Sequence, residues 1–393
     1  MKQFPKKIQK KLSDRVVTNS LRKLSTKANL VDFSSNDYLG FSLSKEIFEK
    51  THQYLIENNL QQNGSTGSRL LSGNHRLHEE VEQQLTSFFN SESALLFNSG
   101  YDANIGLFSS IPQRGDVILY DEYIHASIRD GIRLSNAKTY SFKHNDLNAL
   151  EELLKRRSEL VSESHQSEIY IVTESVFSMD GDSPDLKALS KLCKKHHSHL
   201  IVDEAHAVGV FGKNGCGLVK ELNLEKEVFA TIVTFGKAMG CHGAAILGSE
   251  KLKEYLINFA RSFIYTTALP PHTLATIKMA FEQLVILSAN EESLFIKLQE
   301  NIQYFNQQQS TNNNQLNFIE SNSAIHCCVI PGNESVKSIA KKLQEREFDI
   351  KPILSPTVKE GQERLRICLH AFNSKQEIDE VLKLLTTFVT TSP

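Results

Sequence analysis

The sequence predicts an α/β fold in which a mostly parallel sheet lies between helices. Short apolar runs alternate with helical patterns through the middle of the chain, as they do in proteins whose parallel strands are joined by helices. The runs are too apolar for strands that have one face in water, so we expect both faces of the sheet to be buried. The six runs are Leu95–Phe97, Val117–Tyr120, Ile169–Thr173, Leu200–Val202, Ile232–Phe235 and Ala244–Leu247.

Helical periodicity fills the gaps between these runs. In one example, apolar residues recur at spacings of four, four and three residues: Leu77, Val81, Leu85 and Phe88. This spacing places them on one face of a helix. We expect the other faces to carry the glutamates of the same stretch: Glu79, Glu80 and Glu82.

The part of the chain after Pro270 and Pro271 has a different pattern. A long helical stretch is followed by the Asn/Gln-rich segment Gln307–Gln315, which is typical of a surface loop or linker. The segments that follow predict a smaller α+β domain: a strand at 324–330, a helix at 335–346, a strand at 364–369 and a last helix after Ser374. We therefore expect an N-terminal segment (1–45), a large domain (46–270) and a C-terminal small domain (271–393).

Bulk composition excludes several classes of protein. The formal net charge of −2 argues against a general nucleic-acid binder, which needs an excess of Lys and Arg. No run of about 18 apolar residues is present, and the basic N-terminus lacks an apolar signal core, so we expect neither membrane spanning nor export. The six cysteines lack the spacing of a zinc site or a disulfide framework, which favours a cytoplasmic protein without a structural metal.

Two stretches at strand ends combine polar side chains with glycine or an acid, where ligands of open α/β sheets bind. In Asn98-Ser-Gly-Tyr101 the backbone amides of the next helix could hold a phosphate, although a tight turn explains the same residues. In Ile201-Val-Asp-Glu-Ala-His206 an acid ends a strand and a histidine follows three residues later. Asp203 could pair with a ring nitrogen, or it could cap a helix, and His206 could be purely structural.

Two further stretches place a lysine and a histidine at strand ends. Lys237 follows a buried strand and is flanked by glycines, which suits a lysine that forms a Schiff base, although an exposed lysine is the simpler alternative. His125 lies in the loop after another strand, where its ring could stack on a planar cofactor or could cap a helix. A P-loop and a dinucleotide glycine fingerprint are both absent from the sequence.

Together these residues match the chemistry of pyridoxal 5′-phosphate (PLP). The set contains a lysine for the aldehyde, an acid for the pyridine nitrogen, a stacking ring and a cup for the phosphate. The combination is far more specific than any one member. It therefore predicts a PLP site at the carboxyl edge of the sheet.

The sequence also resembles the α-oxoamine synthases, which are fold-type I PLP-dependent enzymes. Five segments spread over nearly the whole chain carry the resemblance: Phe33–Gly40, Gly64–Gly73, Phe177–Asp182, Asp203–His206 and Thr234–Lys237. The resemblance implies a large domain with a seven-stranded sheet. It also implies a homodimer whose sites are shared between subunits.

The resemblance assigns roles around the cofactor. Lys237 would carry PLP, Asp203 would pair with the pyridine nitrogen, and His125 would stack on the ring. His206 would lie near the phenolic oxygen of PLP. The remaining implied cofactor contacts are Ser178, Thr234, the backbone of Gly100 and Tyr101, and either Thr266 or Thr267 from the neighbouring subunit.

Within this family, Ile264–Pro271 and Leu354–Val358 are most similar to the member of biotin biosynthesis, which joins L-alanine to a pimeloyl thioester with loss of CO2. Arg366 matches the arginine that holds the amino-acid carboxylate. The acyl group would arrive on coenzyme A or on acyl carrier protein. The other positions that match the substrate site are Arg22, Asn36 and Thr357.

Alternative activities share the cofactor residues. A 2-amino-3-ketobutyrate ligase that uses glycine and acetyl-CoA, and a synthase of long-chain α-aminoketones, both stay open on the sequence. A non-catalytic scaffold of the same fold would lack the lysine or the acid, whereas Lys237 and Asp203 are present. A dehydrogenase is disfavoured because its glycine fingerprint is missing.

Overall fold

A computed structural model describes residues 4–22, 24, 29–156, 167–288, 293–312 and 316–390. The chain divides into two compact units. The larger unit contains residues 36–178 and 183–297, and the smaller unit contains residues 1–35, 179–182 and 298–393.

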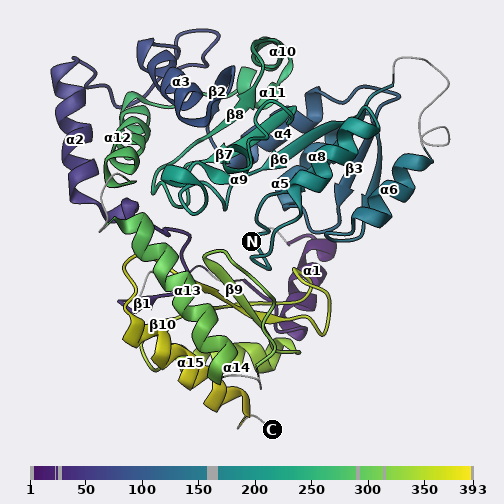
Figure 1. The fold of residues 1–393 in the computed structure, drawn as a ribbon, viewed down its shortest axis with the longest axis vertical. Helices are drawn as coiled ribbons and strands as arrows, with labels where there is room; N and C mark the ends of the chain where they lie inside the picture. The colour runs from purple at the N-terminus through teal and green to yellow at the C-terminus, as the bar shows by residue number, and fades with distance from the viewer. Residues whose placement is uncertain are drawn as a thin grey trace. The chain divides into compact units, whose positions relative to one another are not determined.

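A twisted sheet forms the centre of the larger unit (Figure 1). Within the described residues it has seven strands, in the order β2-β8-β7-β6-β5-β3-β4. Strand β8 is antiparallel to β2 and β7, and the other neighbouring pairs are parallel. The predicted mostly parallel α/β architecture is confirmed. The bounds are β2 (Ser93–Phe97), β3 (Val117–Asp121), β4 (Lys138–Phe142), β5 (Ile169–Glu174), β6 (His199–Asp203), β7 (Ala230–Thr234) and β8 (Ala244–Gly248).

Helices cover both faces of this sheet. One face packs on α4 (Gly100–Ser110), α5 (Ala126–Leu134), α10 (Glu250–Phe259) and α11 (Arg261–Ile264). The other face packs on α6 (Leu147–Lys155), α8 (Leu186–Lys195) and α9 (Gly217–Glu221). Because successive side chains of a strand point to opposite faces, Ile118 joins the first core, whereas Val117 and Leu119 join the second. This double burial explains why the strands are so apolar.

Three further helices pack together at the β2 end of the larger unit: α2 (Lys45–Glu57), α3 (Arg76–Phe89) and α12 (Pro271–Ser288). Two short 3₁₀ turns, Phe41–Leu43 and Lys213–Gly215, lie in its loops. None of the helices in the described part of the chain combines the length and apolar character that crossing a bilayer requires.

The expected helix 77–88 is present as α3, but Glu82 does not lie on an exposed face. Its carboxylate is buried and forms ion pairs with Arg69 and Lys253. The backbone N–H of Leu96 also donates to this carboxylate. A buried carboxylate with two cations and an N–H donor has its lost hydration replaced, which is why the glutamate is tolerated inside.

One strand of the sheet is missing from the six apolar runs. Strand β4 pairs with β3 at one edge of the sheet, and four of its five residues are exposed. An exposed edge strand gains little from apolar side chains, so hydropathy does not reveal it. The predicted run ending at Phe235 is also one residue too long, because β7 ends at Thr234.

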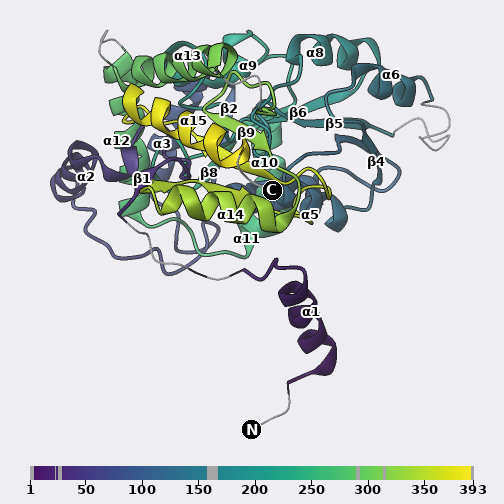
Figure 2. The same ribbon diagram turned by 90° about the horizontal axis from the view of Figure 1, so that it is seen from below.

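The smaller unit contains two small sheets and several helices (Figure 2). Strands β11, β12 and β9 form an antiparallel sheet in that order, and β1 pairs with β10 in parallel. Helices α14 and α15 lie side by side. The bounds are α1 (Lys6–Val17), β1 (Val31–Asp32), β9 (Ile325–Val329), α14 (Asn333–Gln344), β10 (Phe348–Asp349), β11 (Lys351–Ile353), β12 (Arg364–Cys368) and α15 (Lys375–Thr390). Helix α13 (Leu294–Asn312) begins in the larger unit and belongs to the smaller unit from residue 298 onward.

The prediction of a loop at Gln307–Gln315 is wrong for its first part. Helix α13 continues to Asn312, and residues 313–315 lie outside the described residues. Glutamine is a fair helix former, so a polar run can extend an existing helix. The observed division also differs from the expected boundaries at 45 and 270, because α12 packs on α2 and α3 and so belongs with the larger unit.

A buried histidine in the smaller unit makes stability depend on pH. His326 on β9 is fully buried against Phe305, and burial lowers its pKa to about 3. The unfolded chain has the ordinary value of about 6.5. As the pH falls from about 7 to about 5, the unfolded histidine takes up a proton that the folded one does not, so the folded protein loses stability.

The His326→Phe variant should lose about 2 kcal/mol less of its free energy of unfolding over this pH interval than the wild type. Urea denaturation at the two pH values measures the difference. His242→Phe, at an exposed histidine, is the matched control and should keep the wild-type dependence. An unchanged pH dependence in His326→Phe would contradict the expectation.

Candidate active site

The parallel strands β5, β6 and β7 bring their carboxyl ends to one edge of the sheet. In the strand register Glu174 lies beside Asp203, and Asp203 lies beside Ile232. Lys237 follows the end of β7 three residues later. Glu174 and Asp203 are both buried, and Lys237 is half-buried. The predicted lysine and acid therefore belong to the same edge.

A hydrogen-bond chain starts at Lys237. Its Nζ lies 2.7 Å from Nε2 of His206, and Nδ1 of His206 lies 2.7 Å from the hydroxyl of Tyr38. The Tyr38 hydroxyl donates to Oδ1 of Asn36 at 3.2 Å. Because the Tyr38 hydrogen points to Asn36, Nδ1 of His206 donates to Tyr38 and Nε2 is left to accept from Lys237. Three side chains thus orient the lysine amine.

A second chain joins Asp203 to His125. Oδ2 of Asp203 accepts from Nδ2 of Asn104 at 3.0 Å, and Oδ1 accepts from the amide of Ala205 at 2.9 Å. Nδ2 of Asn104 also donates to Oγ of Ser127 at 3.0 Å. Oγ of Ser127 lies 2.7 Å from Nδ1 of His125, which is exposed as a whole residue, although partial burial of its imidazole lowers the pKa. The ring is therefore held at its Nδ1 edge.

Glu174 is a second carboxyl at this edge, and its electrostatic setting differs from that of Asp203. Oε1 of Glu174 accepts from the backbone N–H of His125 at 2.5 Å. Burial raises the pKa of Glu174 well above its ordinary range, and the neighbouring charge of Asp203 raises it further. We therefore expect Glu174 to be neutral at pH 7, because two adjacent buried carboxylates repel each other.

The predicted phosphate loop begins helix α4. The Ser99 hydroxyl caps this helix by accepting from the amide of Asp102 at 3.1 Å. A Cβ placed on Gly100 would lie 3.5 Å from the Thr234 hydroxyl, so the helix start and the end of β7 are neighbours. The Tyr101 side chain is half exposed and donates to Asp130. Free N–H groups and the helix dipole at this position favour a bound anion.

Asn98 anchors the segment that contains the two predicted threonines. Its Nδ2 donates to the Thr266 hydroxyl at 2.9 Å and to the Thr267 carbonyl at 2.7 Å. Within this chain both threonines therefore lie beside the strand that precedes the phosphate loop. Their predicted contribution to a neighbouring subunit stays a prediction.

The remaining predicted residues fall in different places. Ser178 is buried just after β5, and its backbone bonds to Glu174. Arg22, Thr357 and Arg366 belong to the smaller unit, where Arg22 and Thr357 are exposed. Arg366 is buried on β12, and its Nη1 lies 2.9 Å from Sγ of Cys368. Their predicted contacts with substrate stay predictions.

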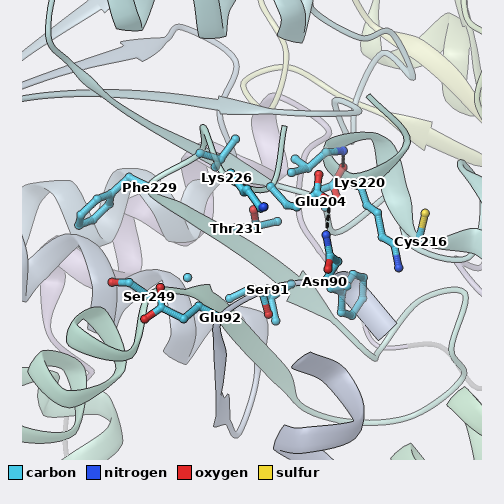
Figure 3. A pocket seen from close by; sticks show the side chains of 16 residues that line it. Asn90, Ser91, Glu92, Glu204, Cys216, Lys220, Lys226, Phe229, Thr231 and Ser249 are labelled. Atoms are coloured by element: carbon cyan, nitrogen blue, oxygen red, sulfur yellow. Dashed lines mark hydrogen bonds between the residues drawn. The ribbon is translucent and has the colours of Figure 1, made fainter. Parts of the chain in front are cut away.

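A separate pocket of about 540 Å³ lies at the opposite end of β7 (Figure 3). Phe229 and Thr231 at the start of β7 line it, together with Ser249 after β8 and Glu92 before β2. Lys237 does not line this pocket. Because ligands of open α/β sheets bind at the carboxyl ends of parallel strands, the edge that holds Lys237 is the stronger candidate.

Comparison with known proteins identifies the family. The sequence matches the aminotransferase class I and II family over residues 28–385. It is 41% identical to an 8-amino-7-oxononanoate synthase from Emericella nidulans over 371 residues, which cover 91% of this chain and 89% of that protein. The chain belongs to the 8-amino-7-oxononanoate synthase family. The predicted family is thereby confirmed, and the chain is an enzyme of the transferase class.

Solved structures agree with this family. The crystal structure of 8-amino-7-oxononanoate synthase from Francisella tularensis matches with a TM-score of 0.76 and 31% identity, over 92% of this chain and 98% of that one. A serine palmitoyltransferase from S. paucimobilis with bound PLP-myriocin matches with a TM-score of 0.84 and 25% identity, over 98% of this chain and 96% of that one. The fold of the 8-amino-7-oxononanoate synthase family is therefore that of PLP-dependent transferases, as predicted.

The side chains at the sheet edge fit PLP on their own chemistry. Lys237 offers a half-buried amine, Asp203 offers a buried carboxylate, and the start of α4 offers backbone donors for a phosphate. The imidazole of His125, an exposed residue, supplies a flat ring. No group in this set conflicts with a flat, anionic cofactor that carries an aldehyde.

The sequence prediction missed three side chains of this edge: Tyr38, Asn104 and Glu174. Glu174 directly follows the predicted run Ile169–Thr173, so the rule that identified Asp203 would also have identified Glu174. Asn104 is a polar residue in an apolar part of α4, which is a usable signal for a buried polar role. Tyr38 lies in a loop, where no periodicity indicates its direction.

Replacing Glu174 with Gln should change how stability depends on pH. Between the ordinary carboxyl pKa of 4.5 and the raised value, the folded protein holds a proton that the unfolded chain has released. Stability of the wild type therefore falls as the pH rises through this range. Gln keeps the shape and the acceptor but does not titrate.

We expect the cofactor-free Glu174→Gln variant to gain stability relative to the wild type above roughly pH 5, on the order of 1 kcal/mol per pH unit. Denaturation curves across this range measure the gain. Glu79→Gln, at an exposed glutamate, controls for the loss of a charge. A constant difference between variant and wild type at all pH values would refute a neutral Glu174.

Proposed function

We propose that this chain condenses L-alanine with a pimeloyl thioester to give 8-amino-7-oxononanoate, CO2 and the free thiol, as a PLP-dependent step of biotin biosynthesis. Support comes from the relatives that share about two fifths of its sequence over most of its length. The observation that carries the proposal is Lys237, whose amine lies 2.7 Å from Nε2 of His206 at the sheet edge that also holds the buried acid Asp203.

Each chain residue would have a defined task. Lys237 would hold the cofactor and, once released by the substrate amine, would take the proton from the alanine Cα. PLP, when bound there, supplies an electron sink for the negative charge that this proton transfer leaves. Asp203 would keep the pyridine nitrogen protonated, and His125 would cover one face of the ring.

His206 is placed to support the proton transfer. Its Nε2 lies 2.7 Å from Nζ of Lys237, and Tyr38 fixes the ring through Nδ1. A fixed acceptor at this distance orients the lone pair of the lysine amine. It can also share the proton that the lysine removes and later returns.

Arg366 would bind the substrate carboxylate. The nearby Arg364, two residues earlier on β12, forms a buried ion pair with Asp180 and donates to the Met179 carbonyl. That guanidinium therefore already has a carboxylate partner. Arg366 donates from Nη1 to Sγ of Cys368 at 2.9 Å. The proposed assignment of Arg366 rests on its match to the family arginine that holds the amino-acid carboxylate.

The proposal extends to the assembly and the compartment. We place the active form as a homodimer in which Thr266 or Thr267 of one chain reaches the phosphate bound by the other. The acyl group would be delivered by coenzyme A or by acyl carrier protein. All six cysteines are free thiols, which supports a reducing cytoplasm.

Lys237→Ala should abolish both the visible absorbance of PLP-treated protein and the condensation of L-alanine with pimeloyl-CoA. The reason is that the amine of Lys237 is the group proposed to carry the cofactor. Absorbance spectra and release of free thiol measure the two effects. Lys226→Ala, at an exposed lysine, should leave both unchanged.

Two results would overturn the proposal. Wild-type protein that shows no absorbance of lysine-bound PLP would exclude the PLP enzyme. Wild-type protein that turns over glycine with acetyl-CoA faster than alanine with pimeloyl-CoA would change the substrate but keep the chemistry.

Arg366→Lys should raise the KM for L-alanine roughly 10-fold or more, with a smaller effect on kcat. A lysine keeps the charge but cannot make the bidentate pair with a carboxylate. Steady-state kinetics with varied alanine measure the effect. Arg346→Lys, at an exposed arginine, is the control, and an unchanged KM for alanine in Arg366→Lys would remove Arg366 from the substrate site.

A further inference from the structure

Asn104 connects two parts of the candidate site that come from different segments. It lies in helix α4, one turn after the predicted phosphate loop, and its side chain points into the protein, where the residue is only 2% exposed. Ser127 belongs to α5 and Asp203 ends β6. A single amide therefore bridges a helix start and a strand end.

The direction of these hydrogen bonds follows from the chemistry of the partners. Asp203 can only accept when it is ionised, so the nitrogen of the Asn104 amide must face it. The second amide hydrogen is donated to Oγ of Ser127, which leaves the Ser127 hydrogen for Nδ1 of His125. The Ser127 amide also donates to this Nδ1, at 3.2 Å. Nδ1 of His125 is consequently an acceptor.

The oxygen of the same amide differs from the nitrogen in its hydrogen bonding. Oδ1 of Asn104 is buried and has no hydrogen-bond partner among the described residues. A buried polar atom without a partner costs about 1–3 kcal/mol. If the side chain served packing alone, the unpaired oxygen would only destabilise the protein. Both hydrogens of the amide, however, form hydrogen bonds, and these connect it to residues of the proposed cofactor site.

We propose that Asn104 is a positioning residue for the cofactor: its two amide hydrogens fix the Asp203 carboxylate toward the pyridine nitrogen and, through Ser127, fix the ring of His125. This inference rests on the proposed use of PLP. It goes further because it states which residue sets the orientation of the Asp203 carboxylate, and that residue acts without touching substrate or cofactor. Loss of the amide lets the carboxylate rotate away from the ring nitrogen.

The test compares PLP with 1-deazapyridoxal 5′-phosphate, in which a C–H replaces the ring nitrogen. Both ligands are titrated into the cofactor-free wild type, Asn104→Ala and Asn104→Leu, and dissociation constants are measured from absorbance and fluorescence. Loss of a hydrogen bond to a charged group predicts about 10-fold weaker binding of PLP in both variants. The analogue has no nitrogen for Asp203 and keeps only the support of the His125 ring, so its dissociation constant should rise clearly less than that of PLP.

Asn301→Ala is the matched control. Asn301 is also buried, and its Nδ2 donates to two carbonyls of the smaller unit, those of His370 and Asn373. It should leave the ratio of the two dissociation constants at the wild-type value. Asn104→Leu keeps a side chain of similar size, so it separates loss of the amide from formation of a cavity.

The outcomes are distinct. Equal weakening of PLP and of the analogue in the Asn104 variants would overturn the proposed positioning of the Asp203 carboxylate toward the ring nitrogen. A wild type that binds the two ligands equally well would show that Asp203 does not engage the ring nitrogen, which also overturns it. A wild type that binds PLP at no concentration tested would instead reject the proposed function itself.

Discussion

The parallel register of β5, β6 and β7 is the constraint on which the candidate site depends. It sets Glu174 level with Asp203 and sets Asp203 level with Ile232, two residues before β7 ends. Both faces of these strands are buried, so a shift of one residue would move every side chain to the wrong face. The apolar cores on both faces therefore fix the positions along the sheet edge at which Asp203 ends β6 and the loop that carries Lys237 begins.

This register creates an electrostatic problem, because it places two carboxyl groups side by side in a buried setting. The structure treats them differently. Asp203 receives N–H donors from Asn104 and Ala205, whereas burial and the charge of Asp203 raise the pKa of Glu174. One buried negative charge costs less free energy than two on neighbouring residues of adjacent strands. The edge thus presents a single carboxylate, and the neutral Glu174 serves as an acceptor for the backbone of His125.

The parts of the fold that could be predicted from the sequence are those in which hydrophobic burial decides the structure. The six apolar runs correspond to six strands of the large sheet, since a strand covered on both faces must be apolar. Strand β4 was not predicted, because an exposed strand at the edge of the sheet does not need apolar residues. Helix α13 extends into the polar segment that was predicted to be a loop, because those residues still favour a helix and hydropathy does not measure helix propensity.

The candidate site divides in the same way. Lys237, Asp203 and His206 could be predicted because each ends or follows a strand, and chain order alone then places it at the edge of the sheet. Tyr38 and Asn104 reach the edge from a loop and from the second turn of a helix, so only the folded chain shows their direction. Residues that orient the site are in general harder to predict than those that end its strands.

Asn104 shows how a local cost can mark a functional arrangement. A leucine or an alanine at position 104 would leave no amide oxygen unpaired. The amide can be retained only if its two donors contribute more than the oxygen costs, and one of them meets a carboxylate, where hydrogen bonds are strongest. A violation of the usual rules for buried polar groups is expected at functional sites. The position of this one, between Asp203 and His125, agrees with a site organised around a flat ring that carries a nitrogen.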